Sequence, residues 1–559
     1  MVLVLIALGM SFPVLALEPA LGPLTNDPSL ASVATPVFEE VAAEKAYDGN
    51  HNKIFDNLEE KLAAAGPADK LPVIVQFNLP VSQRLLDDLK GRLGDLAAKY
   101  QYHSIPALAL NLDKAQIDLL SRLPNVTSVQ YDQKMQAFMD TASNYFGVAK
   151  ARADFGVTGD MDGNPTSYSS RDIVVAVIDT GIDGAHVDLD AGKIIAWKDY
   201  INGRTTPYDD NGHGTHVAAT IAGTGEGNPA YKGVAPGAAL IGLKVLDSAG
   251  SGYTSDIDAA IDWVIQNKAA YGIEIISMSL GSTGSSDGTD STSQLLNKAA
   301  AAGIAPVVAA GNSGPARYTI GSPAAAADAI TVGAMADPGE KGFSQAYFSS
   351  RGPTADGRVK PDISSPGVNI TSARANSTNG YVSMSGTSMA TPFVSGTVAL
   401  MLAANPVLTP AQVKSKLMGT IIDWGPAGTD IDYGAGRLQG YEAVKSAGGF
   451  AGTGPVVPLH YYASGTLTGT GDYDDWTINI TSTTFPIALT LIMPNWSSSS
   501  NPDFDLYLYN PSGTQVASSL GTKRQETIGF LPTVTGTYKI RIKSYTGSGN
   551  YFFDVSANK

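Results

Sequence analysis

The sequence predicts an α/β protein built on a parallel β-sheet, with a small α+β unit before it and an all-β domain after it. Between residues 141 and 450, short runs rich in Val and Ile alternate with stretches of helical spacing, which is typical of a parallel sheet covered on both faces. Residues 71–140 have the order strand, helix, strand, helix, strand. From about residue 455, helical spacing ends and alternating short strands indicate a β-sandwich or jelly roll over residues 455–559.

Composition limits the classes of function. The chain has 559 residues, too many for one hydrophobic core, with 43% hydrophobic and 16% charged residues, as in globular proteins. Its net charge of -15 and its lack of a basic run argue against a nucleic-acid partner. The absence of cysteine excludes disulfides and a thiolate nucleophile or metal ligand.

Residues 1–16 have the pattern of a signal peptide. The apolar run from Val2 ends in Val14-Leu15-Ala16, where a cut after Ala16 is expected, although no Lys or Arg precedes the run. A membrane anchor is the alternative, but the run is shorter than the ~20 residues that a span needs. We therefore expect a secreted protein without a stable membrane anchor. Residues 17–70 lack firm periodicity and are assigned to an N-terminal extension.

The small unit begins with the strand-like run LPVIVQF at residues 71–77. Helical spacing follows over residues 81–100, and IPALALNL at residues 105–112 predicts a second strand. Asp113 and Gln116 form a capping-box pattern that opens a helix through Leu123. NVTSVQY at residues 125–131 predicts the last strand. On these residues alone, the unit could be an ordinary N-terminal domain.

The central domain has six apolar runs that predict parallel strands, and helical stretches such as residues 255–270 and 293–302 follow several of them. Ligands bind at the carboxyl ends of such strands, and Asp179 and Asn312 are placed there. The predicted strands cover residues 172–179, 194–197, 239–246, 273–280, 304–310 and 329–334. The predicted strands of the C-terminal domain cover residues 476–482, 487–493, 504–510, 537–545 and 551–557.

Three short motifs in the central domain together indicate nucleophilic catalysis. They are VAVIDTGID around Asp179, NGHGTHVA around His213 and GTSMATP around Ser388. In this order they supply an orienting carboxylate, a general base and a hydroxyl nucleophile. Ser388 precedes an apolar helical stretch, so its hydroxyl is expected at a helix N-terminus, where an N-cap role is the simpler alternative.

With these motifs, residues 71–450 resemble the subtilisin-like serine proteases, the subtilases. The resemblance implies a subtilisin-like catalytic domain over residues 141–450 with Asp179, His213 and Ser388 as its triad, Asn312 as oxyanion donor and His216 as a structural residue. Residues 71–140 then resemble the propeptide, an intramolecular inhibitor that the enzyme removes by a cut near residues 135–142. The implied protein is a secreted, monomeric serine endopeptidase that hydrolyses protein and peptide substrates through an acyl-enzyme.

Substrate binding also follows from the resemblance. Two segments resemble edge strands that hold an extended peptide by β-augmentation, and a third resembles the wall of the pocket for the residue before the cut bond. These segments contain no acidic residue, so a broad preference for apolar or aromatic side chains is expected. The three segments are Ser279, Leu280 and Gly281; Gly250, Ser251 and Gly252; and Ala309, Ala310 and Gly311.

Calcium is the expected cofactor. Asp188 matches a family calcium ligand, but the loop of residues 225–232 lacks the expected Asn pattern. Two acidic clusters supply hard oxygen ligands of the kind that calcium prefers, and each is also compatible with a solvated turn. They consist of Asp160, Asp162 and Asn164, and of Asp472, Asp474 and Asp475 with Asp503 and Asp505 beyond.

The sequence leaves two other functions open. GTSMA loosely fits the nucleophile elbow of α/β-hydrolase esterases, which need a histidine after the serine. His460 is the only histidine after Ser388 and would serve that role. A non-catalytic secreted binding protein is the third hypothesis, and the complete set of Asp179, His213, Asn312 and Ser388 argues against it.

Overall fold

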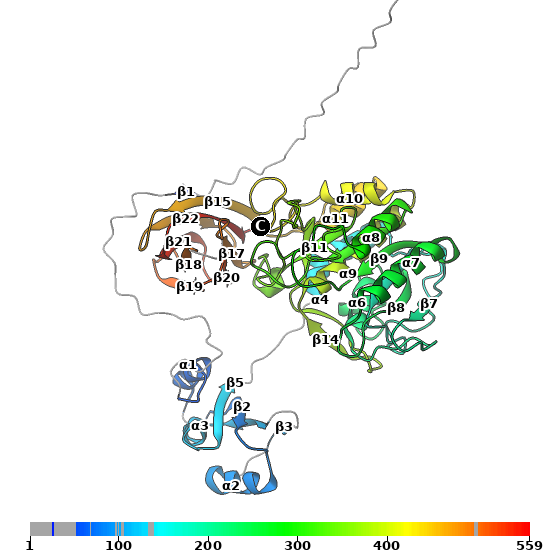
Figure 1. The fold of residues 1–559 in the computed structure, drawn as a ribbon. Coiled ribbons are helices and arrows are strands. Elements are labelled where there is room, and N and C mark those ends of the chain that lie inside the picture. Colours follow the sequence, from blue (N-terminus) through cyan, green and yellow to red (C-terminus); the bar gives the residue numbers. More distant parts are fainter. Residues whose placement is uncertain are drawn as a thin grey trace, which may run out of the picture.

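The computed structural model describes residues 25–26, 52–66, 69–94, 98, 100–101, 106–131, 139–496 and 501–559. The predicted signal peptide at residues 1–16 lies outside these residues, as do residues 135–138 of the predicted cleavage region at 135–142. Figure 1 shows the chain organised as the small α+β unit, the α/β domain and the all-β domain, in that order.

The small unit is a four-stranded antiparallel sheet with helices packed on it. Its sheet order is β3-β4-β2-β5, and the predicted capping box of Asp113 and Gln116 is present at the start of α3. Ile54, Leu58 and Leu62 are buried in the same core, so residues 52–66, predicted to be extension, fold with this unit. Its elements are α1 (Asp56–Ala64), β2 (Leu71–Phe77), α2 (Gln83–Leu93), β3 (Tyr100–Gln101), β4 (Ala107–Leu112), α3 (Lys114–Ser121) and β5 (Val126–Tyr131).

The α/β domain contains a seven-stranded parallel sheet, which confirms the predicted fold class. The order of the strands is β12-β11-β10-β9-β6-β8-β7. All six predicted strands are present, and the structure adds β12, whose Ser-Ser-Pro sequence lacks an apolar run. The strands are β6 (Val174–Asp179), β7 (Ile194–Asp199), β8 (Ala239–Lys244), β9 (Ile273–Met278), β10 (Ala305–Ala309), β11 (Ile330–Met335) and β12 (Ile363–Pro366).

Successive residues of the interior strand β6 face two separate cores. Val175 and Val177 pack with one core, which includes α6 and α9, whereas Val174 and Ala176 pack with the other, which includes α7 and α8. Both faces are therefore apolar, as the continuous Val and Ile runs predicted. The helices of this domain are α4 (Met139–Tyr145), α5 (Val148–Phe155), α6 (His213–Ala222), α7 (Thr254–Tyr271), α8 (Ser291–Ala301), α9 (Thr387–Ala404), α10 (Pro410–Met418) and α11 (Gly440–Gly448), and a hairpin joins β13 (Ile370–Ala373) to β14 (Tyr381–Met384).

Helix α9 passes through the centre of this domain (Figure 1). By length and composition it could cross a membrane, but 83% of its most apolar 18-residue window is buried inside the protein. It packs against α6, α11 and β11. Its hydropathy is therefore that of a core helix.

The C-terminal domain is an antiparallel β-sandwich. Its two sheets have the orders β1-β16-β21-β18-β19 and β15-β22-β17-β20, and their inner faces share one apolar core. β15, β19 and β20 were not predicted, and β1 comes from the N-terminal extension. The strands are β1 (Thr25–Asn26), β15 (Leu459–Leu467), β16 (Tyr473–Ile480), β17 (Ile487–Ile492), β18 (Asp503–Tyr509), β19 (Gln515–Ser519), β20 (Gln525–Phe530), β21 (Gly536–Thr546) and β22 (Gly549–Ala557).

The sandwich packs directly on the α/β domain (Figure 1). Ile492 and Phe552 of the sandwich belong to a core cluster of the α/β domain. The Gln525 side chain donates to the Gln345 carbonyl oxygen at 2.8 Å and accepts from Arg351 at 2.7 Å. The two domains therefore share a buried interface with apolar and polar contacts.

Candidate active site

A cleft of about 780 Å³ lies at the carboxyl ends of the central strands. His213, Asn312 and Ser388 line it, and so does Thr180, the residue after Asp179. β6 ends at Asp179, α6 begins at His213, and Ser388 is the second residue of α9. Three elements far apart in sequence thus meet at one opening.

Asp179 and His213 are hydrogen-bonded. His213 Nδ1 lies 2.7 Å from Asp179 Oδ1, and the Asp179 carboxylate is almost completely buried. Burial lowers the pKa of His213, but the charge and hydrogen bond of Asp179, together with the charge of Asp209, raise it above the ordinary value overall. Thr180 N also donates to Asp179 Oδ1 at 2.7 Å. The carboxylate therefore holds the ring through Nδ1, which leaves Nε2 available as a base.

Ser388 lies in the same cleft, with its hydroxyl turned toward β9. Its Oγ donates to the carbonyl oxygen of Ser279 at 3.1 Å, and Ser279 Oγ donates to the Ser388 carbonyl oxygen at 2.8 Å. The hydroxyl hydrogen bond of Ser388 in this structure is therefore to Ser279 rather than to His213. Catalytic hydrogen bonds are often unformed without substrate, and rotation about χ1 redirects the hydroxyl.

Asn312 is held by its side-chain oxygen. Oδ1 accepts from Thr387 N at 2.9 Å and from Thr387 Oγ1 at 3.1 Å. This assignment leaves the Nδ2 amino group as a donor in a residue that lines the cleft. Sequence reasoning missed Thr387, although it stands next to Ser388 in the same motif.

Two side chains next to the proposed triad have structural contacts: His216, the second histidine of the His213 motif, and Asp183, the second aspartate of the Asp179 motif. His216 is fully buried and its Nε2 lies 2.8 Å from the Ile370 carbonyl oxygen, and burial lowers its pKa to about 4. The carboxylate of Asp183 accepts from the backbone N–H groups of Ala185 and Asn376. Both side chains are therefore hydrogen-bonded to groups outside the Asp179–His213 pair.

Most of the residues predicted to bind substrate lie around the cleft, and Ala310 is the exception. Ala310 is 1% exposed and belongs to a core cluster. The cleft also has a lining that the sequence did not indicate: Leu246, Thr254, Ile257, Asp290, Thr292, Ser322 and Pro323. The predicted residues that line it are Ser279, Leu280, Gly281, Gly250, Ser251, Gly252, Ala309 and Gly311.

Asp290 places one acidic side chain in this cleft. Its carboxylate accepts from Ser322 Oγ at 2.6 Å, from Ser293 N at 2.9 Å and from the hydroxyls of Ser293 and Ser286. Burial raises the pKa of Asp290, but these hydrogen bonds outweigh it and lower the pKa overall. The carboxylate is therefore charged, and its oxygens already accept four protein donors.

One acidic group among the described residues has metal-binding geometry. It consists of Asp160, Asp162 and Asp172, whose carboxylate oxygens lie within 4.8 Å of one another. Asp172 takes the place in this group that the sequence assigned to Asn164, whose Oδ1 instead accepts from the Thr166 hydroxyl at 3.1 Å. Asp172 lies ten residues after Asp162, so a sequence pattern of adjacent ligands does not reveal it. The fold brings its side chain back to this loop.

The other predicted metal ligands have protein partners. Asp188 is buried and accepts from Gly227 N at 3.0 Å and from the Tyr381 hydroxyl at 2.9 Å. Asp475 forms a bidentate pair with Arg541, Asp474 accepts from the Tyr551 hydroxyl, and Asp472 accepts from Thr468. Each of the last three side chains therefore has a different partner, whereas the sequence predicted one cluster. Neighbouring residues of a strand point to opposite faces of a sheet, which separates their side chains.

His460 lies at the junction of the two domains. Its Nε2 is 2.7 Å from Asp554 Oδ1, and its ring stacks on Trp424 with centroids 4.0 Å apart. It is the second residue of the sandwich strand β15 and is not among the residues that line the cleft. The esterase hypothesis, which needs His460 as the base, is therefore wrong.

Three family models match the chain: the subtilase family at residues 170–436, the Tk-SP N-propeptide domain at residues 49–116, and the bacterial pre-peptidase C-terminal domain at residues 472–544. Serine protease AprX of Bacillus subtilis is 40% identical over 348 residues, covering 58% of this chain and 76% of that protein. Subtilisin DY of Bacillus licheniformis is 38% identical over 274 residues, covering 49% of this chain and 90% of that protein. The solved structure of Sphericase is 36% identical, with a TM-score of 0.43, and the match covers 53% of this chain and 99% of that one.

Proposed function

The chain belongs to the subtilase family, and from this premise we propose that Asp179, His213 and Ser388 are its catalytic triad. The protein is a subtilisin-like serine endopeptidase made as a precursor with an N-terminal propeptide domain. The observation that carries the triad is the 2.7 Å contact between His213 Nδ1 and Asp179 Oδ1 at the cleft that Ser388 also lines. This contact leaves Nε2 as the base.

The proposed reaction is acyl transfer. The Ser388 hydroxyl rotates away from the Ser279 carbonyl oxygen, gives its proton to His213 Nε2 and attacks the carbonyl carbon of the peptide. The tetrahedral intermediate collapses, His213 gives the proton to the leaving amine, and the acyl group remains on Ser388. Water then attacks the ester through the same base, which releases the acid product and restores Ser388.

We assign the oxyanion hole to Asn312 Nδ2 and the backbone N–H of Ser388. The first N–H groups of a helix have no intrahelical acceptor, and Ser388 lies in the first turn of α9. Thr387 fixes the Asn312 amide through its backbone N–H and its hydroxyl. Both donors would then be oriented before negative charge develops on the substrate oxygen.

Peptide substrates are proposed to bind as an extended strand between Gly250–Gly252 and Ser279–Gly281. Leu246 and Ile257 add apolar surface to this cleft. The Asp290 carboxylate is already the acceptor of four protein hydrogen bonds. We therefore retain the expectation that apolar or aromatic side chains are preferred before the cut bond.

The propeptide domain is proposed to inhibit the enzyme until the enzyme removes it. The relatives of the chain include subtilisins of Bacillus species. We propose that this protein is secreted and acts as a monomer without a membrane anchor. Tight inhibition by a covalently attached domain requires no external partner, because the effective concentration of an attached segment is high.

Subtilases commonly bind calcium, and we propose that Asp160, Asp162 and Asp172 hold a calcium ion. Carboxylate oxygens are the ligands that calcium prefers, and these three side chains bring theirs within 4.8 Å of one another. Asp172 also accepts from the backbone N–H groups of Met161 and Ser169, which fixes the loop around the group. Bound calcium would relieve the repulsion among the three carboxylates and so stabilise this loop.

The decisive experiment is Ser388→Ala in the full precursor. We expect no casein hydrolysis and no removal of the propeptide by the purified variant. Ser385→Ala is the matched control, because Ser385 is exposed, stands three residues earlier and bonds to Asn369. Hydrolysis or propeptide removal by Ser388→Ala at the rate of the control would overturn the assignment.

A further inference from the structure

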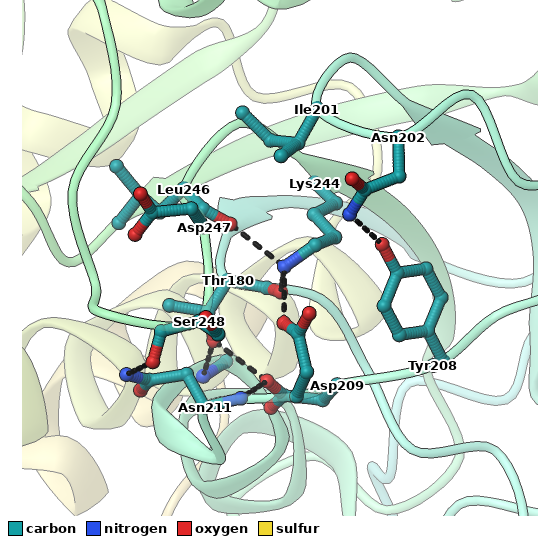
Figure 2. Close-up of polar contacts among 12 residues, drawn as sticks. Thr180, Ile201, Asn202, Tyr208, Asp209, Asn211, Lys244, Leu246, Asp247 and Ser248 are labelled. Carbon is teal, nitrogen blue, oxygen red and sulfur yellow. Dashed lines mark hydrogen bonds and ion pairs between the residues drawn. The ribbon is translucent and has the colours of Figure 1, made fainter.

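Lys244 lies under the active site with its side chain completely buried. It is the last residue of β8 and is paired in register with Asp179 of β6. Its ammonium donates to the Thr180 carbonyl oxygen at 2.5 Å, the Leu246 carbonyl oxygen at 2.7 Å and Asp210 Oδ1 at 2.7 Å. Figure 2 shows the ammonium facing Thr180 and Leu246. All three of its hydrogens are therefore used.

The three acceptors belong to three different parts of the site. Thr180 directly follows Asp179, Asp210 stands three residues before His213, and Leu246 lines the cleft ahead of Gly250–Gly252. One cation thus joins the segments that carry the carboxylate, the base and one wall of the peptide cleft. A buried ammonium needs a full set of acceptors, so the three segments cannot separate without a large cost in free energy.

The loop before His213 has two anchors. On its inner side, Asp209 accepts from the backbone N–H groups of Asn211, Gly212 and Thr215. Asn211 in turn accepts from His213 N at 3.1 Å. It also donates to the Ser248 carbonyl oxygen at 3.1 Å (Figure 2). On its outer side, the loop is held through Asp210 and Lys244.

We propose that Lys244 is a positioning residue for the reaction. Its ammonium holds the His213 loop against Thr180 and Leu246 and so fixes the base relative to both Asp179 and the bound peptide. The proposal rests on the proposed function of the triad. Lys244 itself touches neither the substrate nor the reacting atoms.

The principal test is Lys244→Met, which keeps the length of the side chain and removes the charge. We expect kcat for a peptide anilide to fall by about 10²-fold, the scale of a roughly 1 Å misplacement, and to fall more than KM rises. The ionisable groups that act on His213 are Asp179, Asp209 and His216. If the imidazole moves away from Asp179, the midpoint of the acidic limb of kcat/KM falls, whereas simple loss of a nearby positive charge would raise it.

Lys360→Met is the matched control. Lys360 is a second buried lysine of the same domain, and its ammonium donates to the Ala329 carbonyl oxygen at 3.0 Å and to Asp362 at 2.6 Å. We expect this variant to lose stability but to keep the wild-type kcat and pH profile. A folded Lys244→Met enzyme with the kcat and acidic midpoint of this control would overturn the proposal.

Asp210→Asn covers the case in which Lys244→Met does not fold. The Asp210 side chain is 35% exposed, so the neutral amide is tolerated, and its hydrogen bond to Lys244 loses the contribution of charge. We expect kcat to fall severalfold, and an unchanged kcat would overturn the proposal. Ser388→Ala is assayed alongside. An inactive wild type, or an active Ser388→Ala variant, would instead reject the triad.

Discussion

The guanidinium of Arg524, in the β-sandwich, donates to both carboxylate oxygens of Asp432 in the α/β domain, and both side chains are almost completely buried. Arg351 lies 3.3 Å from the same carboxylate. Burial raises the pKa of Asp432, but the charges of Arg524 and Arg351 outweigh this and lower the pKa overall. The two domains therefore contact each other through a buried ion pair, in which the sandwich supplies Arg524 and the α/β domain supplies Asp432.

Arg524→Leu is expected to destabilise the whole protein. Removing one partner of a buried ion pair costs about 3–5 kcal/mol, because the remaining charge is left with too few partners. Chemical denaturation in a Ser388→Ala background, which prevents self-digestion, measures the effect. Arg358→Ala is the control, because its pair with Asp356 is partly exposed and such pairs contribute about 0–1 kcal/mol. Equal losses of unfolding free energy in the two variants would contradict a stabilising role for the Arg524–Asp432 pair at the domain interface.

Activity is expected to depend on pH through His213. In the proposed mechanism only neutral His213 can accept the Ser388 proton. Burial lowers the pKa of His213, but Asp179 and Asp209 raise it above the ordinary 6.5 overall. As the pH falls through this raised pKa, kcat/KM should fall by about tenfold for each unit. The pH profile of peptide anilide hydrolysis measures the midpoint, and a midpoint at or below the ordinary histidine value would contradict the predicted geometry.

Asp179→Asn provides the matched test of that pH dependence. The amide cannot supply the charge that raises the pKa of His213, and it favours the wrong ring tautomer. We expect kcat to fall by about 10⁴-fold and the acidic midpoint of the residual activity to move down. A residual activity with an unchanged acidic midpoint would show that a group other than His213 limits kcat/KM at low pH.

If Asn312 is the proposed oxyanion donor, Asn312→Ala is expected to reduce kcat by about 10²–10³-fold with little change in KM, the range known for removal of an oxyanion-hole donor in a subtilisin. The donor acts on charge that appears only in the transition state. Thr387→Val should cause a smaller loss, because the backbone N–H of Thr387 still holds the Asn312 amide at 2.9 Å. Steady-state kinetics separates the two parameters, and a change confined to KM would argue for substrate binding alone.

Calcium is expected to raise the thermal midpoint through the group of Asp160, Asp162 and Asp172. A ligand at a hundredfold excess over its Kd stabilises the folded state by about 2.7 kcal/mol. Asp172→Asn should remove the difference between melting curves in calcium and in chelator. Asp188→Asn is the control, because Asp188 bonds to Gly227 and Tyr381: it should lower stability equally in both conditions. A calcium shift that survives Asp172→Asn would place the ion elsewhere.

Much of the fold was predictable from local pattern. All six predicted strands are present. Five of them are almost entirely buried, because a strand covered on both faces needs apolar residues at every position, whereas the edge strand β7 is half-buried. β12 was missed because its buried residues are largely Ser and Pro. The helix at Asp56–Ala64 was missed although Leu58 and Leu62, with Ile54 before them, have the four-residue spacing of one helical face.

Some residues of the candidate site could likewise be predicted from the local sequence, and others could not. Asp179, His213, Asn312 and Ser388 could be singled out because each stands in a short motif at the end of a strand or the start of a helix. Asp172 could not, because it lies ten residues after Asp162 and outside the D-x-D-x-N pattern. Asp290 could not, because its segment is distant in sequence from the catalytic motifs. Lys244 reads as a single charge at the end of an apolar strand, and nothing local shows that its ammonium reaches Asp210.

By itself, the amino-acid order determined which segments become strands and helices and which side chains have the chemistry of a protease, since periodicity and functional groups are local properties. Only the tertiary structure decided that the Ser388 hydroxyl is directed to Ser279, that Lys244 joins three segments of the site, and that Arg524 ties the sandwich to the α/β domain. Each of these depends on hydrogen bonds or charges between residues that are far apart along the chain and become neighbours only when the elements pack.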